Sequence, residues 1–254
     1  MLVSVITVTK NSARTIERTV HSVASQRNVQ VEHVIKDANS TDKTVKLAYS
    51  INPYLTSLIQ SDIGIYDAMN QGFYHSTGEV VAFLNSDDYY ADPNVLSDVV
   101  DVFSKTKCDF VYGNICMRSL TGEIVRDWKT GNIVDRGLVG IQIPHPALFI
   151  KRSVLNSIGL PFDSSYKISA DLKQQLIMIN QLKCRGFYLN RTLVEMEYGG
   201  ESTNSLASFY LGWKESVRAY NEVFGSGGFY FVFRKVLSKF KGLNIVAQLK
   251  HFGK

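Results

Sequence analysis

At 254 residues the chain is long enough for one large domain or two closely fused halves, and its 45% hydrophobic and 20% charged residues are typical of a soluble globular protein. Its three cysteines form no C-x-x-C pair, which argues against a zinc site or a disulfide framework and favours a reducing, cytoplasmic location. Residues 225–254 hold six Lys and Arg and no Asp or Glu. Because the whole chain has a net charge of +5, residues 1–224 alone have a net charge of −1, so this body of the chain gives no sign of nucleic-acid binding.

The N-terminus predicts a buried strand and not a targeting segment. It is apolar but lacks the basic start of a signal peptide, and the polar residues 10–12 follow at once. No apolar run approaches the roughly 18 residues that a membrane-spanning helix needs. We therefore expect a chain that is neither exported nor membrane-spanning.

The first hundred residues alternate between strand-like and helix-like segments. Apolar runs rich in β-branched residues predict four strands: residues 3–9, 31–36, 55–60 and 79–84. Apolar residues at helical spacing predict three helices between them: residues 12–25, 41–50 and 66–76. Gly78 follows the third of these, where the end of a helix is expected. The alternation predicts a Rossmann-like α/β fold, with a mostly parallel central sheet covered by helices.

After residue 108 the alternation is less regular. Further strands are predicted at residues 110–114, 122–128 and 188–198. Helices are predicted at residues 170–181 and 208–224, and a mobile loop at residues 199–202. We find no internal repeat and no long linker, so we expect the two halves to share one continuous sheet.

Polar residues gather where the predicted strands end. Ligands of open parallel sheets bind beyond the carboxyl ends of the strands. That rule selects four segments: residues 9–11, 37–42, 62–67 and 85–88. Three of them are rich in carboxylates, which repel one another unless a cation or hydrogen-bond donors compensate. A phosphate ligand bridged by a metal ion supplies such compensation.

The most informative of these segments is the run from Asn85 through Ser86 to Asp87 and Asp88. Mg²⁺ and Mn²⁺ favour carboxylate oxygens and share their coordination with substrate phosphates. An acidic turn that caps the helix starting near Pro93 is the alternative interpretation.

Asp37 stands directly at the end of the second strand, where it could accept a hydrogen bond from a nucleobase. Ser40, Thr41 and Asp42 follow it and can cap the next helix, so we interpret those three as mainly structural.

Four motifs between residues 3 and 88 carry a resemblance to a known family. They are V-S-V-I-T-V-T-K-N from residue 3, D-x-x-S-T-D-x-T from residue 37, S-D-x-G-I-Y-D-A-M-N-x-G from residue 61, and T-G-E at residue 77 running into L-N-S-D-D at residue 84. Their order and spacing resemble the family 2 glycosyltransferases with the GT-A fold, most of all the enzymes that build bacterial surface polysaccharides. The resemblance weakens after about residue 115 and continues to about residue 205.

The resemblance implies a set of donor-binding residues: Thr9, Asn11, Asp37, Asp67, Asn70 and Asp87. In it Asp37 binds the base, usually uracil, while Asp87 and Asp88 form the acidic motif that holds Mn²⁺ or Mg²⁺. Which of the two aspartates touches the ion and which the ribose stays open. Family members often carry Asp where this chain has Asn85.

The resemblance also implies a catalytic base. Members carry an acidic pair at the start of a helix in the second half, and here only its second acid, Asp171, is present after Ala170. Asp171 would remove the proton from an acceptor hydroxyl in a single inverting displacement. A helix N-terminal charge favoured by the helix dipole is the alternative role. His145 falls where related chains have a histidine, so it could line the acceptor site or be structural.

These expectations combine into one functional hypothesis. An inverting hexosyltransferase would move a sugar from a nucleotide-sugar, preferably a UDP-sugar, to an acceptor hydroxyl, with a lipid-linked glycan as the expected acceptor. Residues 1–108 would bind the donor, residues 109–207 would hold the acceptor and the base, and residues 208–254 would form C-terminal helices.

Two other functions stay open at this point. Asn85 and Ala170 leave room for a degenerate nucleotide-sugar-binding module. A sugar nucleotidyltransferase is disfavoured because residues 9–14 contain no glycine, whereas those enzymes begin with a Gly-rich loop.

The basic tail predicts an amphipathic helix from Phe229. Apolar residues follow one face at helical spacing: Val232, Phe233, Val236, Leu237, Phe240 and Leu243. Basic residues flank or oppose them: Arg234, Lys235, Lys239 and Lys241. Such a helix can lie on an anionic membrane, so residues 229–254 suggest a peripheral location on the cytoplasmic face. A helix packed on the body with solvated lysines is the alternative.

Overall fold

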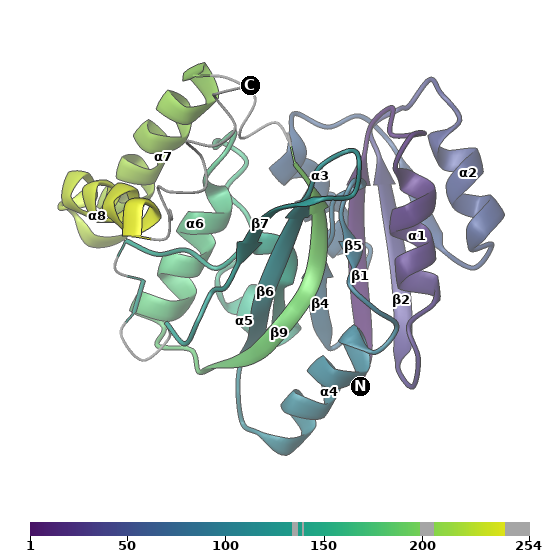
Figure 1. Cartoon of the computed structure of the whole chain (residues 1–254), viewed down its shortest axis with the longest axis horizontal. Coiled ribbons are helices and arrows are strands. Elements are labelled where there is room, and N and C mark those ends of the chain that lie inside the picture. The colour runs from purple at the N-terminus through teal and green to yellow at the C-terminus, as the bar shows by residue number, and fades with distance from the viewer. Residues whose placement is uncertain (134–136, 139, 199–205, 242–254) are drawn as a thin grey trace.

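The computed structural model of the chain describes residues 1–133, 137–138, 140–198 and 206–241 (Figure 1). Its strands are β1 (Leu2–Thr9), β2 (Gln30–Asp37), β3 (Thr56–Ile59), β4 (Val80–Phe83), β5 (Tyr89–Tyr90), β6 (Phe110–Arg118), β7 (Ile124–Trp128), β8 (Leu148–Lys151) and β9 (Gly186–Glu197). Its α-helices are α1 (Ile16–Ala24), α2 (Thr44–Ile51), α3 (Ile65–Tyr74), α4 (Val95–Lys105), α5 (Arg152–Ser157), α6 (Ala170–Gln175), α7 (Leu206–Phe224) and α8 (Gly228–Lys241). A 3₁₀ turn, η2 (His145–Ala147), and a π-helical segment, η3 (Leu176–Gln181), complete the described elements.

The described strands form one mixed sheet, in the order β3-β2-β1-β4-β8-β6-β9-β5 with β7 beside β6. β1, β2, β3 and β4 are parallel to one another, as the alternation predicts. β8 is antiparallel to both β4 and β6, while β9 runs parallel to β6. The pairing of β4 with β8 joins the two halves, which confirms the prediction of one continuous sheet.

Helices cover both faces of this sheet because strand side chains alternate in direction. Val3 and Val5 of β1 pack in one core with residues of α1 and α4. Ile6 and Val8 point the other way and pack with α3, α6 and the C-terminal helices. Figure 1 shows α7 and α8 on the outer side of α6, far from α1 and α2.

Gly78 has a different role from the one predicted. α3 ends before it, at Tyr74, so Gly78 does not end a helix. A Cβ atom on Gly78 would lie 2.5 Å from Ser4 Oγ and 2.6 Å from Ser4 N. Only glycine allows this close approach of the turn before β4 to β1, and the Gly78 N–H donates to Ser4 Oγ at 2.7 Å.

The second half departs furthest from the predicted elements. The helix predicted over residues 170–181 is α-helical only to Gln175 and continues as the π-helical η3. α5, β5 and β8 were not predicted, since they are short and take their form from the strands and helices around them. The loop predicted at residues 199–202 lies outside the described residues. No helix among the described residues has the length and apolar character needed to cross a bilayer.

The apolar face predicted for the tail helix α8 is divided between core and solvent. Phe231 and Val232 are buried in the core, with Val236 packed against it. Phe233 and Leu237 are exposed on another side of the helix. The helix is confirmed over Gly228–Lys241, and the body of the protein covers only part of the predicted apolar face. The side chains of residues 238–241 and all of residues 242–254 lie outside the described part of the chain.

Candidate active site

The carboxyl ends of β1, β2 and β4 meet at one edge of the sheet. Thr9 and Asp37 are direct partners in the parallel register of β1 and β2. Residues 85–88 follow β4, which pairs with the other side of β1. β3 is parallel to β2, so residues 62–67 follow at this edge as well. The structure therefore brings all four predicted segments to one edge, as expected for a ligand site of an open parallel sheet.

The acidic turn after β4 holds buried oxygens that lack partners. Asp88 is 1% exposed, and its Oδ2 accepts a hydrogen bond from Asn85 Nδ2 at 3.2 Å. Asp88 Oδ1, Asn85 Oδ1 and Thr9 Oγ1 have no hydrogen-bond partner among the described residues. Buried polar atoms are rarely left unpaired, so these oxygens are candidates to bind a ligand.

Electrostatics favour a cation at the same turn. Burial raises the pKa of Asp88 well above its usual value, and the neighbouring Asp87 raises it further. Burial also raises the pKa of Asp87, and the nearby Glu197 adds to that effect. A bound cation would offset both the burial and the repulsion between the two carboxylates.

The residues present fit a hard divalent cation. Asp87 and Asp88 supply the oxygen ligands that Mg²⁺ and Mn²⁺ prefer, and the unpaired Asn85 Oδ1 is a further carbonyl oxygen beside them. The described part of the chain gathers no three His, Cys, Asp or Glu residues in a metal-binding arrangement. Such a sparse set of ligands suits a Mg²⁺-type ion that takes others from water and substrate phosphate.

Two arginines of α1 and its preceding turn border the acidic turn, and the sequence reasoning missed them. Arg14 binds both carboxylate oxygens of Glu197, at 3.0 and 2.5 Å. Arg18 donates to the backbone oxygen of Asp87 at 3.1 Å and lies 4.3 Å above the ring of Tyr89. Their spacing of four residues was the only available signal, because Glu197 comes from β9 at the far end of the chain.

The other predicted donor residues of the first loops are tied into local turns. Asp37 is fully buried and accepts hydrogen bonds from Ser40 N at 2.7 Å and Ser40 Oγ at 2.5 Å. Asn11 has a φ of 51°, and its Oδ1 accepts from Thr41 N at 2.9 Å. The two loops therefore hold each other in place, and Asp37 has the structural partners that the sequence did not reveal.

Asp67 and Asn70 of α3 have separate roles. Asp67 accepts from Ile63 N at 3.1 Å and so fixes the start of the helix. Asn70 is buried and binds the backbone of Phe162 twice, donating to its oxygen at 2.7 Å and accepting from its N–H at 3.0 Å. This amide joins the two halves of the protein, and its implied place at the donor pocket stays a prediction.

Asp171 lies in the first turn of α6, close to the start of α3. Its Oδ2 accepts a hydrogen bond from Gln142 Nε2 at 2.5 Å. Tyr66 Oη lies 3.4 Å from its Oδ1 and donates to the Ile168 oxygen at 2.6 Å. Because Tyr66 begins α3 just beyond β3, Asp171 lies at the same edge of the sheet as the donor segments. Ala170, where the resemblance implies an acid, is fully buried in the core.

Burial raises the pKa of Asp171, and the positive charge of Lys235 on α8 opposes that rise. A carboxylate with a pKa moved toward the working pH is better suited to accept a proton.

Glu215 of α7 fixes the loop that leads to Asp171. Its side chain is buried and accepts hydrogen bonds from the backbone N–H groups of Lys167, Ile168 and Ser169 at 2.9, 2.8 and 2.9 Å. The C-terminal helices are therefore part of the site. No sequence pattern indicates this role, since a single Glu in an amphipathic helix is ordinary.

His145 is packed among aromatic rings. Its imidazole lies 5.8 Å from Phe83 and 5.5 Å from Phe162, and burial lowers its pKa to about 4. A neutral histidine in this position fits the structural alternative better than contact with an acceptor.

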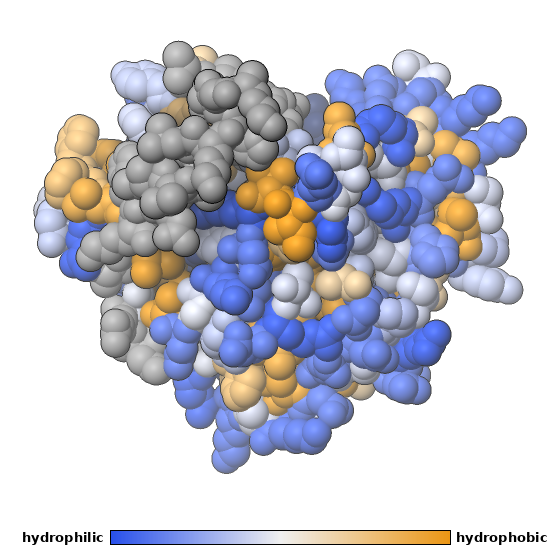
Figure 2. Space-filling view, in the orientation of Figure 1, coloured by the Kyte–Doolittle hydropathy of each residue, from blue (hydrophilic) through white to orange (hydrophobic). Residues whose placement is uncertain are grey.

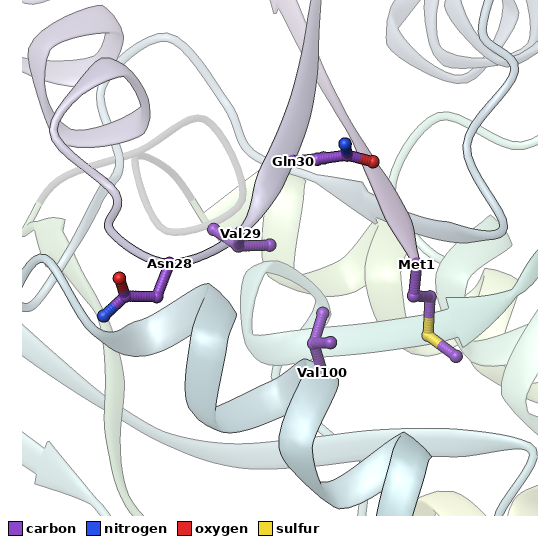
Figure 3. Close-up of a pocket in the computed structure, with 5 residues that line it drawn as sticks. All are labelled: Met1, Asn28, Val29, Gln30 and Val100. Atoms are coloured by element: carbon purple, nitrogen blue, oxygen red, sulfur yellow. The ribbon is translucent and has the colours of Figure 1, made fainter.

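A hollow at the opposite edge of the sheet is not part of this site. It encloses about 410 Å³ beside Met1, Asn28, Val29, Gln30 and Val100 (Figure 3). Those residues lie at the amino ends of β1 and β2 and on α4, and none of them has a charged side chain.

A family model described as Glycosyl transferase family 2 matches residues 4–155. The chain belongs to glycosyl transferase family 2. The acidic turn and the segments that follow β1, β2 and β3 all lie within the matched residues.

Two curated relatives come from mycobacteria. A PGL/p-HBAD biosynthesis glycosyltransferase of Mycobacterium bovis (strain BCG / Pasteur 1173P2) is 32% identical over 173 residues. That match covers 66% of this chain and 66% of the relative, so this family 2 chain spans just under two thirds of that relative's length. An uncharacterized glycosyltransferase of Mycobacterium tuberculosis (strain CDC 1551 / Oshkosh) is 33% identical over 219 residues, covering 83% of this chain and 80% of its own.

Solved structures confirm the GT-A-like fold. S. aureus TarS 1-349 in complex with UDP-GlcNAc has a TM-score of 0.69 at 19% identity, covering 93% of this chain and 72% of its own. Mannosyltransferase PcManGT from Pyrobaculum calidifontis, in complex with GDP-Man and Mn²⁺, has a TM-score of 0.61 at 17% identity, covering 99% of this chain and 79% of its own.

Proposed function

We propose that this family 2 chain is a metal-dependent, inverting glycosyltransferase that uses a nucleotide-sugar donor. The observation that carries the proposal is the acidic turn, where Asp88 and Asn85 hold unpaired oxygens on the same sheet edge as Asp171. TarS in complex with UDP-GlcNAc and PcManGT in complex with GDP-Man and Mn²⁺ support a nucleotide-sugar and a divalent ion as its ligands. A UDP-sugar is the first donor to test, and the group transferred is a hexosyl residue.

Each proposed site residue has one task. Asp87 and Asp88 hold the cation, which when bound offsets charge on the departing nucleoside diphosphate. Thr9 and Asn11 line the nucleoside, and Asp37 binds the base. Asp67, which the start of α3 holds in place, faces the donor sugar.

Asp171 performs the proton transfer. The acceptor oxygen forms a bond to the anomeric carbon while the bond from that carbon to the diphosphate oxygen breaks. The hydroxyl proton passes to Asp171 Oδ1, since Oδ2 is held by Gln142. One displacement of this kind inverts the anomeric configuration and needs no covalent sugar intermediate.

The replacement of Asp171 by Asn tests this mechanism against a binding module. We expect Asp171→Asn to bind the UDP-sugar with unchanged affinity, as measured by calorimetry. Its rate of nucleotide release should fall by at least about 100-fold, the typical contribution of a positioned base. Asp101→Asn, an exposed carboxylate of α4, is the matched control. A wild type that binds the donor and never releases nucleotide, even with acceptor glycans supplied, would favour the degenerate module.

We also propose that α8 docks on an anionic membrane that carries a lipid-linked acceptor. Its outward side exposes four large apolar residues: Phe229, Tyr230, Phe233 and Leu237. Figure 2 shows hydrophobic side chains on the surface over this helix. Arg234 lies among them and is exposed, which supplies positive charge toward anionic headgroups. A peripheral location on the cytoplasmic face follows from this proposal.

Vesicle cosedimentation tests the membrane contact. The change of Phe229, Phe233 and Leu237 together to Ser should reduce binding to anionic vesicles by at least about 10-fold, since roughly 1.5–3 kcal/mol accompanies the burial of each large side chain. Deletion of residues 229–254 should reduce it further. Leu120→Ser, on the exposed turn between β6 and β7, is the control. Binding that the triple variant leaves unchanged would refute the membrane role of α8.

A further inference from the structure

A lysine of the C-terminal helix α8 is linked to the proposed base. Lys235 Nζ donates a hydrogen bond to Gln142 Oε1 at 2.8 Å. Gln142 Nε2 donates in turn to Asp171 Oδ2 at 2.5 Å. Two hydrogen bonds thus connect a helix at the end of the chain to a carboxylate in the first turn of α6.

The packing of α8 directs Lys235 inward. Phe231 and Val232 are buried in the core, and Lys235 follows them by four and three residues, on the same face of the helix. Lys235 is half-buried, while its neighbour Arg234 is exposed. The inward position of Lys235 is therefore a consequence of the apolar contacts that hold α8 to the body.

The loop that carries Gln142 lies directly against the backbone of α8. A Cβ atom on Gly140 would lie 2.6 Å from Arg234 Cβ and 2.9 Å from Lys235 N. Gly140 also has a φ of +73°, a conformation that strains other residues. Only glycine fits there, and the close contact holds Gln142 beside both Lys235 and Asp171.

The charge of Lys235 determines which way the Gln142 amide faces. An ammonium group only donates hydrogen bonds, so it must face the amide oxygen of Gln142. The amide nitrogen then faces Asp171, where it donates to Oδ2. In this arrangement Asp171 Oδ1 is the oxygen left to receive a proton.

We propose that Lys235 and Gln142 are positioning residues that keep Asp171 oriented and ionised for catalysis. The inference rests on the proposed function, in which Asp171 is the base. It adds that α8 takes part in the chemistry through its inward side, whereas membrane docking would use its outward side.

The charged and titratable groups around Asp171 support this role. Tyr66 of α3 lies at its Oδ1, and burial keeps the pKa of Tyr66 far above its ordinary value, so the phenol stays neutral. Glu215 of α7 is engaged with backbone N–H groups of the loop before α6. Lys235 is the positive group that lowers the pKa of Asp171 against the effect of burial.

The full-length protein allows a direct test by ¹³C NMR of aspartate carboxyl groups. The resonance of Asp171 is assigned as the one that Asp171→Asn removes. Lys235→Met removes the charge at nearly constant length, Lys235→Arg keeps the charge, and Lys214→Met removes a charge from an exposed position of α7 as the control. Gln142→Leu removes both hydrogen bonds from the loop side without changing α8.

We expect Lys235→Met to raise the pKa of Asp171 by about 0.5–1 unit. At a pH below that pKa, the ionised fraction of Asp171 then falls roughly three- to tenfold. The acidic limb of kcat should move upward by the same amount, with the donor KM unchanged. Gln142→Leu should shift both in the same direction, while Lys235→Arg and Lys214→Met should resemble the wild type. A structural role for Lys235 would lower activity equally at every pH.

The outcomes separate this inference from the proposed function. If Asp171→Asn is inactive but Lys235→Met and Gln142→Leu leave both the titration and the pH profile unchanged, the positioning role is wrong and the base stands. If Asp171→Asn retains full turnover, Asp171 is not the base and the positioning role fails with it, whatever the carboxyl titration shows.

Discussion

The Asp88 carboxylate is buried, and the surrounding protein does not fully satisfy its charge with hydrogen bonds. It is 1% exposed, one of its oxygens has no partner, and Asp87 stands beside it. An unpaired buried charge lowers the stability of the folded protein, and the proposed metal-binding role would explain why a carboxylate stands here. Stability and function therefore oppose each other at this residue.

Asp88→Asn should accordingly stabilise the metal-free protein. The amide keeps an oxygen that can accept from Asn85 and removes the desolvated charge, so we expect the free energy of unfolding to rise by roughly 1–2 kcal/mol. Urea unfolding in the presence of a chelator measures this change, with the exposed Asp101→Asn as control. A less stable Asp88→Asn would show that the carboxylate has a structural partner instead of a ligand.

At the scale of elements, α7 holds the loop in front of the proposed base. Three backbone N–H groups of this loop donate to one buried carboxylate, Glu215. The C-terminal helices thus do more than extend the fold, because the geometry of α6 depends on them.

Glu215→Gln should loosen this loop. The amide nitrogen must then face at least one of the three N–H groups, so we expect a loss of about 2 kcal/mol in the free energy of unfolding. Turnover should fall while donor affinity remains, since the loop lies beside Asp171 and away from the nucleotide segments. Thermal unfolding and donor calorimetry measure the two effects, with the exposed Glu123→Gln as control. Wild-type turnover in Glu215→Gln would contradict this positioning.

The ion pair between Lys173 of α6 and Asp163 predicts that the stability of the protein depends on pH. Burial alone would raise the pKa of Asp163, but hydrogen bonds from Lys173 and Ser165 outweigh it and lower the pKa to about 2. Because an unfolded Asp has a pKa of about 3.9, this stabilisation is present above that value and is lost as the pH falls toward 2.

Lys173→Met should reduce that dependence. The free energy of unfolding of the Lys173→Met variant should fall less than that of the wild type between about pH 4.5 and pH 2.5. Urea unfolding at each pH measures both. Equal acid sensitivity of the two proteins would mean that Lys173 does not hold the ionised form of Asp163.

At the scale of the whole molecule, local patterns predicted the donor half and tertiary contacts decided the rest. The parallel strands β1 to β4 and the segments at their ends follow from apolar periodicity and from motifs that lie close in sequence. Gln142, Glu215 and Lys235 carry no local signal. Each acts on α6 from a distant part of the chain, so only the packed structure reveals them.

Tertiary contacts also explain why two short strands, β5 and β8, were not predicted. β8 is formed by four residues between β4 and β6, and β5 by two residues beside β9, lengths too short for a periodic pattern. The apolar spacing of α8 predicted which residues share one face of the helix. It could not predict that the body of the protein covers Val232 and Val236 and leaves Phe233 and Leu237 exposed.

Metal-dependent donor binding is the most direct test of the central claim. We would measure the thermal unfolding of the wild type, Asp87→Asn and Asp88→Asn with UDP-, GDP- and dTDP-sugars, each with and without Mn²⁺. A ligand at about 100 times its Kd adds roughly 2.7 kcal/mol to the free energy of unfolding. We predict that one nucleotide class, UDP first, stabilises the wild type only when Mn²⁺ is present, and that Asp88→Asn or Asp87→Asn loses this effect. A folded wild type that no nucleotide-sugar stabilises, with or without the ion, would contradict the account.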